Sequence, residues 1–376
     1  MAVVVEKVPG AKASAPAQFG LINLLKVIAA QLIVLHHLAF YGPMADYARP
    51  LMPDVIDWLD SFARIAVQVF LVIGGFLVAK SLFAQGQPGA INPLATVWRR
   101  YAKLVPPFMV AILCAVAASA LATRWMTHDS ISAPPDLLQL AAHALLLQGV
   151  LGYDSLSAGA WYVAIDFQLY AVAALLVWLC GRFSGARWRR WLMPAVIVTG
   201  ISLSLLYFNR DPAWDEWAPY FFGSYGLGIM AWLASDPKRR PRAVALLVAM
   251  IVLPTLLALA LDFRLRIAVA LAVACVLFLF GRVRTGPASY RGMSAVNRLA
   301  QISYSVFLIH FPVCLVVNAA FARFIPPEPL YQALGMLTAW AASLAAGALF
   351  YRCVELPLGR VLQSLSEARA ARMAFV

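Results

Sequence analysis

The chain has 376 residues, of which 63% are hydrophobic and 12% are charged, and its mean hydropathy is +0.79. These values exclude a soluble globular protein and predict an all-α, polytopic membrane protein. The formal charge of +13 could indicate a nucleic-acid-binding protein. The distribution of the basic residues excludes that class, as the loops show.

Hydropathy predicts about ten transmembrane helices. Residues 1–19 have no apolar core and are expected to form a flexible cytoplasmic tail. Residues 20–352 form the predicted membrane domain, and residues 353–376 are expected to be a cytoplasmic C-terminal tail. The predicted helices lie near residues 20–41, 62–84, 104–123, 159–180, 192–208, 218–235, 243–261, 267–281, 300–323 and 331–352.

The loops between these helices alternate sharply in charge. Loops on one side carry 22 of the 30 Lys and Arg residues, whereas those on the other side carry most of the acids. Cytoplasmic loops of membrane proteins are enriched in Lys and Arg, so the pattern places both termini in the cytoplasm. The basic excess is therefore interpreted as a topology signal, with a lipid bilayer rather than a nucleic acid as the partner.

Residues 137–152 are apolar but short and interrupted. A span here would invert every later helix and turn the basic loops outward, against the charge pattern. The segment is therefore predicted to be an interfacial or re-entrant helix on the outer side.

The first span contains the strongest functional signal. Lys26 and His37 are ionisable residues in an otherwise apolar segment, and such residues at membrane depth usually serve a function. Eleven residues make about three helical turns, so both side chains project from nearly the same face, roughly 16 Å apart. This pairing suggests a bound anion near Lys26 and acid–base chemistry at His37. His36 points away from that face and is expected to play a packing or supporting role.

Further polar motifs follow along the chain. Arg64 precedes a Gly-Gly-Phe-Leu segment, and Arg99, Arg100 and Lys103 precede Pro106-Pro107. The segment Trp161-Tyr-Val-Ala-Ile-Asp166-Phe-Gln-Leu-Tyr170 contains the one acid clearly inside a span. Ser303-Tyr-Ser-Val-Phe-Leu-Ile-His310-Phe-Pro and Arg352-Cys-Val-Glu355-Leu-Pro complete the set.

Together these motifs resemble the membrane-bound acyltransferase-3 family, whose members transfer acyl groups, most often acetyl, to hydroxyls of sugars and related acceptors. The resemblance covers residues 20–360, with departures: Lys26 replaces the usual Arg, Gly74 the usual Ser and Asp166 the usual Glu. It implies an acyl-CoA co-substrate, a carbohydrate or glycolipid acceptor and a location in the bacterial inner membrane. No permanently bound cofactor or metal is expected.

The resemblance suggests roles for the motif residues. His37 is expected to act as general base, with Asp166 or Arg64, which are expected to lie together, orienting it or stabilising the oxyanion. The donor phosphates are expected near the cytoplasmic end. The expected donor-binding residues are Lys26, Arg99, Arg100 and Lys103, and the expected supporting residues are His36, His310, Trp161, Tyr170 and Glu355.

Each residue also has a structural interpretation. Lys26 could extend its ammonium to the interface, and Arg99 and Arg100 could simply be topology-determining residues. Asp166 could form an ion pair, and His310 an interhelical hydrogen bond. The same intramembrane charges would also suit a transporter or flippase for a glycan or lipid-linked sugar, although no internal repeat is visible.

Overall fold

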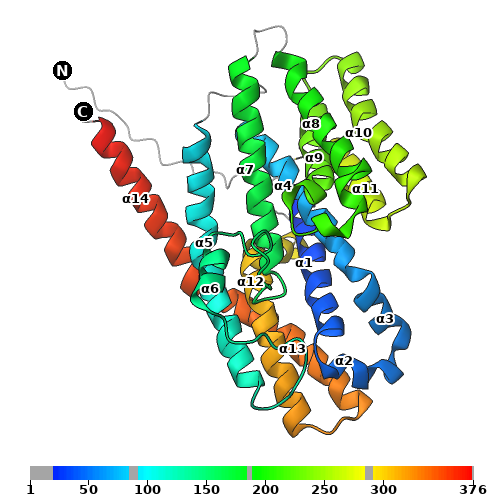
Figure 1. The fold of residues 1–376 in the computed structure, drawn as a ribbon, viewed down its shortest axis with the longest axis vertical. Helices are drawn as coiled ribbons and strands as arrows, with labels where there is room; N and C mark the ends of the chain where they lie inside the picture. The colour runs from blue at the N-terminus through cyan, green and yellow to red at the C-terminus, as the bar shows by residue number, and fades with distance from the viewer. Residues whose placement is uncertain (1–19, 84–91, 184–188, 284–290, 375–376) are drawn as a thin grey trace, which may run out of the picture.

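The computed structural model describes residues 20–83, 92–183, 189–283 and 291–374, and every regular element in these ranges is helical (Figure 1). The N-terminal tail predicted at residues 1–19 lies outside the described residues. The α-helices are α1 (Gly20–Phe40), α2 (Pro43–Ala48), α3 (Pro53–Ser61), α4 (Ala66–Leu82), α5 (Pro93–Ala122), α6 (Leu137–Ala144), α7 (Ala160–Phe183), α8 (Arg189–Leu206), α9 (Ala218–Ala234), α10 (Pro241–Leu261), α11 (Leu265–Phe280), α12 (Arg291–Phe324), α13 (Pro329–Phe350) and α14 (Leu356–Ala374).

The predicted polytopic all-α architecture is confirmed. Eight helical segments in the described part are long and apolar enough to cross a bilayer. The spans predicted at 218–235 and 267–281 correspond to α9, with 17 residues, and α11, with 16. At 1.5 Å per residue, these helices are about 25 Å long, which is shorter than a typical hydrocarbon core. Almost every residue of α9 is buried, so this helix lies inside the bundle rather than against lipid.

The helices form two connected groups (Figure 1). In the first, α4 and α9 pack together and are surrounded by α7, α8, α10 and α11. In the second, α12 packs against α13, α1 and α5. Helix α1 also contacts α4, and α7 contacts both α5 and α9, so these two helices join the groups. The polar residues of the candidate site project from these joining helices and their neighbours.

Local sequence defines several helix starts. The Asn92 side chain accepts a hydrogen bond from the Ala95 amide, and Pro93 occupies the first position of α5. Asp136 caps α6 in the same way through the Gln139 amide. Such caps satisfy amide groups that the helix leaves unpaired, and proline fits the first turn because its missing N–H is not needed there.

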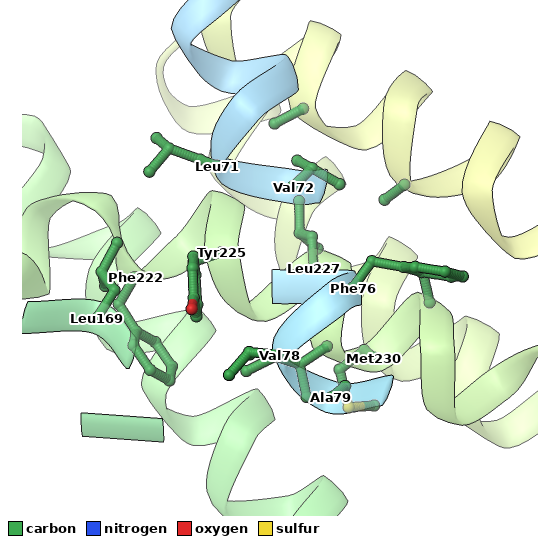
Figure 2. Close-up of a cluster of buried hydrophobic side chains, with 14 of the residues drawn as sticks. Leu71, Val72, Phe76, Val78, Ala79, Leu169, Phe222, Tyr225, Leu227 and Met230 are labelled. Atoms are coloured by element: carbon green, nitrogen blue, oxygen red, sulfur yellow. The ribbon is translucent and has the colours of Figure 1, made fainter. Parts of the chain in front are cut away.

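Helices α4 and α9 cross at unusually short range. A Cβ atom at Gly75 would lie 1.8 Å from the Tyr225 carbonyl oxygen, and one at Gly228 would lie 1.9 Å from the Val72 carbonyl oxygen. Each glycine thus admits the backbone of the opposite helix. Figure 2 shows the apolar side chains around this crossing. Close approach through small residues is a common basis of helix association in membranes, where lipid offers no hydrophobic driving force.

Gly228→Ala is therefore expected to destabilise the protein strongly. The added methyl group meets backbone atoms that cannot rotate away, so α4 and α9 must separate, at a cost of about 1–3 kcal/mol or more. Thermal unfolding in detergent measures this loss. Gly181→Ala is the matched helical control, because a Cβ at Gly181 meets no atom within 4 Å. Equal melting temperatures for the two variants would contradict the close crossing.

The segment predicted as interfacial or re-entrant folds back alongside α5. Only residues Leu137–Ala144 are helical, and turns follow. The Tyr101 hydroxyl donates to the Ala144 carbonyl, and the Gln168 amide donates to the Leu146 carbonyl. Tyr101 precedes the C-terminal end of α5 by 21 residues, or about 31 Å of helix, so the segment runs back along much of α5. The two hydrogen bonds satisfy carbonyl groups at the end of α6 and in the turn that follows it. The only buried residues of this segment are Ala142, His143, Leu146 and Gln148.

The residues predicted as a C-terminal tail continue the last span. Helix α13 passes through a π-helical turn at Tyr351–Glu355 and then into α14. Within the turn, Glu355 accepts a 2.6 Å hydrogen bond from the Ser305 hydroxyl of α12. This bond fixes the end of α13 against α12, next to the basic residues of α5.

Glu216 gives the fold a pH-dependent contribution on the loop before α9. Burial, with the nearby Asp215 and Asp154 charges, raises the pKa of the Glu216 carboxyl above its usual value of 4.5. The folded state therefore favours the protonated form, and this stabilising effect is lost as the pH rises through the raised pKa. Glu216→Gln should raise the melting temperature at pH 7–8 and leave it unchanged at acidic pH below 4.5. A constant difference at all pH values would contradict this assignment.

Candidate active site

Helices α1 and α12 bring two histidines together. His37 Nδ1 lies 2.6 Å from His310 Nε2, and both side chains are buried. The flanking residues explain the approach, because Val34 of α1 packs with Val306 and Cys314 of α12 in one apolar cluster. The ionisable pair therefore sits inside the helix interface.

The two imidazole rings meet edge to edge. Their planes differ by 11° and their centroids are 4.9 Å apart. Two imidazole rings whose nitrogens are 2.6 Å apart cannot have centroids much farther apart than this. The line between the two nitrogens therefore lies close to both ring planes. This is the geometry of a direct N–H···N hydrogen bond rather than of face-to-face stacking.

His36 and Arg64 lie where α1 meets α3 and the turn that follows α3. His36 Nδ1 is 2.9 Å from the Leu59 carbonyl oxygen, which ties α1 to α3. The exposed Arg64 follows α3 and is close enough to interact electrostatically with His36 and Tyr41. The prediction that Arg64 accompanies Asp166 is wrong, because Asp166 is paired elsewhere.

The partner of Asp166 is Arg100. Its Nη2 atom lies 2.6 Å from Asp166 Oδ2, and the Asp166 side chain is 12% exposed, whereas that of Arg100 is 35% exposed. The Arg100 guanidinium also lies over the Tyr170 ring, 5.3 Å from its centroid. Sequence reasoning had assigned Asp166 to the chemistry at His37 and Arg100 to donor binding. The structure joins them in one ion pair at the intersection of α5 and α7.

Lys26 and Lys103 complete a cluster around this pair. Lys26 interacts electrostatically with Arg100, Asp166 and Lys103, and Lys103 also interacts with Glu355. Among the described residues, no hydrogen-bond partner is found for the Lys26 ammonium. We call Lys26, Arg100, Lys103 and Asp166 the cation cluster. Three of the four predicted donor-binding residues thus come together.

The fourth predicted donor-binding residue lies apart from the cation cluster. Arg99 is exposed, and its Nε atom donates to the Ala95 carbonyl one turn earlier in α5. Adjacent helical residues point in directions about 100° apart, and Arg99 shares one neighbour with Arg100, because both interact electrostatically with Tyr170. Among the described residues, Arg99 forms no ion pair with the cation cluster, and its role in donor binding stays a prediction.

Three tyrosines near the cation cluster were missed by the sequence analysis. Tyr225, Tyr162 and Tyr304 interact electrostatically with Asp166, and the Tyr304 hydroxyl donates to the Leu104 carbonyl. Tyr304 lies inside the motif that begins at Ser303, but the predicted role in that motif was assigned to His310. Tyr225 lies in α9, outside every quoted motif. None of the three tyrosines has a spacing pattern in the sequence that would have identified it.

Aromatic side chains lie between the cation cluster and the histidine pair. Tyr162 contacts Phe307, with centroids 5.5 Å apart, and Phe307 contacts His310 at 6.0 Å. Phe70 of α4 packs against both Tyr162 and Phe307. Trp161, predicted as a supporting residue, packs against Phe221 instead. The two polar centres are thus separated by a low-dielectric, largely aromatic layer.

The geometry therefore separates two chemical capacities along α1. The Lys26 end carries excess positive charge suited to an anionic group, and the His37 end carries a paired imidazole suited to proton transfer. Glu355 and Tyr170 stand beside the first centre, and His36 and His310 beside the second. No Asp or Glu contributes to the electrostatics of His37 among the described residues.

The chain is similar to known proteins over most of its length. The family model of an acyltransferase domain, Acyl_transf_3, matches residues 20–350. A Komagataeibacter xylinus protein described as "Putative membrane-bound transacylase BcsY" is 27% identical over 281 residues, covering 68% of this chain and 67% of its own. No solved structure matches the chain.

Proposed function

Because the chain belongs to the acyltransferase-3 family, we propose that it transfers an acyl group, acetyl in the simplest case, from acyl-CoA to a hydroxyl of a sugar or cell-surface polysaccharide. Membership of this family supports acyl transfer by a membrane protein. The identity of the donor, the identity of the acceptor and the roles of the residues are further parts of the proposal. The transacylase name of the relative supports the reaction class.

The observation that supports the proposal most is the hydrogen bonding of the two ring nitrogens of His37. Its Nδ1 atom contacts His310, and its Nε2 atom has no hydrogen-bond partner among the described residues. A buried imidazole with one nitrogen engaged and the other available is the arrangement that general bases use. Nothing in the apolar packing of α1 against α12 requires a histidine pair.

In the proposed reaction, His37 Nε2 removes the proton from the acceptor hydroxyl as its oxygen attacks the thioester carbon. The tetrahedral intermediate then collapses, the C–S bond breaks and CoA leaves as a thiolate. The imidazolium returns its proton to that sulfur, so the enzyme ends in its starting state. His36, which contacts His37, and Arg64, which interacts with His36, would help orient the acceptor.

The cation cluster would bind the phosphates of the donor. Lys26, Arg100 and Lys103 are opposed by Asp166 and Glu355, which leaves an excess of positive charge. Phosphate groups pair well with Arg and Lys. The pantetheine arm would then extend past Phe70 and Phe307 toward His37. A span of about 16 Å between Lys26 and His37 along α1 suits such a long, thin arm.

The cellular setting follows from the same arrangement. The protein is a multi-pass membrane protein, and we assign it to the bacterial inner membrane, with the donor entering from the cytoplasm. The acceptor hydroxyl would approach the His37 end from the outer side. The charge asymmetry of the loops supports this orientation.

Purified wild-type protein in lipid nanodiscs, supplied with acetyl-CoA labelled in the acetyl group, tests the proposal. A panel of mono- and oligosaccharide acceptors should yield CoA release coupled to label in the saccharide. A transporter or flippase would instead move a labelled glycan across proteoliposomes without releasing CoA. That outcome would sink the acyltransferase assignment.

A further inference from the structure

We infer that His310 is the positioning residue that fixes the tautomer of His37, so that the Nε2 atom of His37 always presents a lone pair. The inference rests on the proposed function for its catalytic meaning. Its physical basis is the set of hydrogen bonds around the pair, which the packing of α1 on α12 holds in place.

The donor and the acceptor of each hydrogen bond can be assigned by starting from His310. His310 Nδ1 lies 2.8 Å from the Phe307 carbonyl oxygen and 3.1 Å from that of Val306. Carbonyl oxygens only accept, so His310 Nδ1 must carry a hydrogen and donate. In the neutral ring the other nitrogen is then a pure acceptor. His310 Nε2 is therefore available to accept from His37.

The same assignment of donor and acceptor applies to His37. Its Nδ1 atom, 2.6 Å from His310 Nε2, must donate to that acceptor. The hydrogen of neutral His37 is thus held on Nδ1, and Nε2 is left unprotonated. When Nε2 takes a proton during the reaction, Nδ1–H remains in place and the bond to His310 persists. Backbone carbonyls of α12 consequently determine which nitrogen of α1 acts as base.

His310 replaces the acid that usually performs this task. In Ser-His-Asp enzymes, an aspartate orients the imidazole, and losing its tautomer control costs about 10⁴ in kcat. Here no described Asp or Glu acts on His37, and a neutral imidazole fits a largely aromatic, low-dielectric layer without the cost of burying a charge. The pair thus achieves the same orientation with uncharged groups.

Nitrogen NMR of ¹⁵N-histidine-labelled wild-type protein tests the tautomer directly, since the chain has only five histidines. His37, assigned by its loss in His37→Gln, should show a protonated Nδ1 and an unprotonated Nε2. In His310→Phe, His37 should lose this preference, and kcat should fall at least 100-fold with little change in KM for acyl-CoA.

His310→Gln is the conservative variant, because its side-chain oxygen can reach the position of the lost Nε2 and accept from His37. It should retain the His37 tautomer and restore kcat to within about tenfold of wild type. A wild-type His37 protonated on Nε2, or a His310→Phe protein with the wild-type tautomer and kcat, would overturn the inference. A wild-type protein that releases no CoA would overturn the proposed function instead, while the nitrogen shifts still decide the tautomer.

Discussion

Replacing His37 with alanine is expected to lower kcat for acyl transfer by about 10²–10⁴, the usual contribution of a positioned general base. The substitution removes the one nitrogen proposed to accept the hydroxyl proton and leaves the cation cluster untouched. KM for acyl-CoA should therefore change little, because donor binding is proposed to depend on residues three turns away along α1. Steady-state release of CoA from nanodisc-embedded protein measures both constants.

His128→Ala is the matched control for His37→Ala. His128 lies on the loop after α5, and among the described residues its side chain hydrogen-bonds only with the neighbouring Ser130. Its loss should leave both kinetic constants at wild-type values. If His37→Ala kept wild-type kcat, proton abstraction by this residue would have to be abandoned, whatever the activity of the protein.

Replacing Asp166 with asparagine is expected to cost about 3 kcal/mol of stability, the lower end of the range for breaking a buried ion pair. Arg100 would remain beside Lys26 and Lys103 without its anionic partner, and the three cations would repel one another. The partial exposure of Arg100 keeps the cost from being larger. Reversible unfolding in mixed detergent micelles measures the difference.

Asp57→Asn provides the comparison for Asp166→Asn. Asp57 also pairs with an arginine, Arg49, but both side chains are about half exposed, and such pairs contribute about 0–1 kcal/mol. The double variant Arg100→Met/Asp166→Leu should recover much of the lost stability, because an apolar pair leaves no buried charge unpaired. Equal losses of stability for Asp57→Asn and Asp166→Asn would show that Asp166 does not offset repulsion among the cations of the cluster.

The sequence was sufficient to predict the class of fold and most of its spans. Apolar runs of about 20 residues leave few alternatives to membrane helices, and the charge of the loops orders them. The exceptions were α9 and α11, which are shorter than a typical span. Hydropathy measures composition and not length in space, so it cannot separate a lipid-facing span from a short helix buried by its neighbours.

The candidate site was only partly predictable for a related reason. Helical periodicity placed Lys26 and His37 on one face of α1, because both residues lie on the same element. The partners of Asp166 and His37 come from other helices, 66 and 273 residues away in the chain. Their pairing depends on helix rotation and tilt, which no single-sequence pattern encodes. Hence Arg64 was assigned to Asp166, and His310 was considered only as a supporting residue.

The central claim is that α1 binds the donor at Lys26 and carries out the chemistry at His37. Comparing kcat/KM for acetyl-CoA with kcat/KM for S-acetylpantetheine, which lacks the phosphates, in Lys26→Met tests it most directly. For Lys26→Met we expect a loss of about tenfold or more with acetyl-CoA, the loss expected for one hydrogen bond to a charged group. We expect no loss for S-acetylpantetheine, and wild-type values for Lys238→Met, a lysine on an exposed loop. An equal loss for both donors in Lys26→Met would contradict the claim.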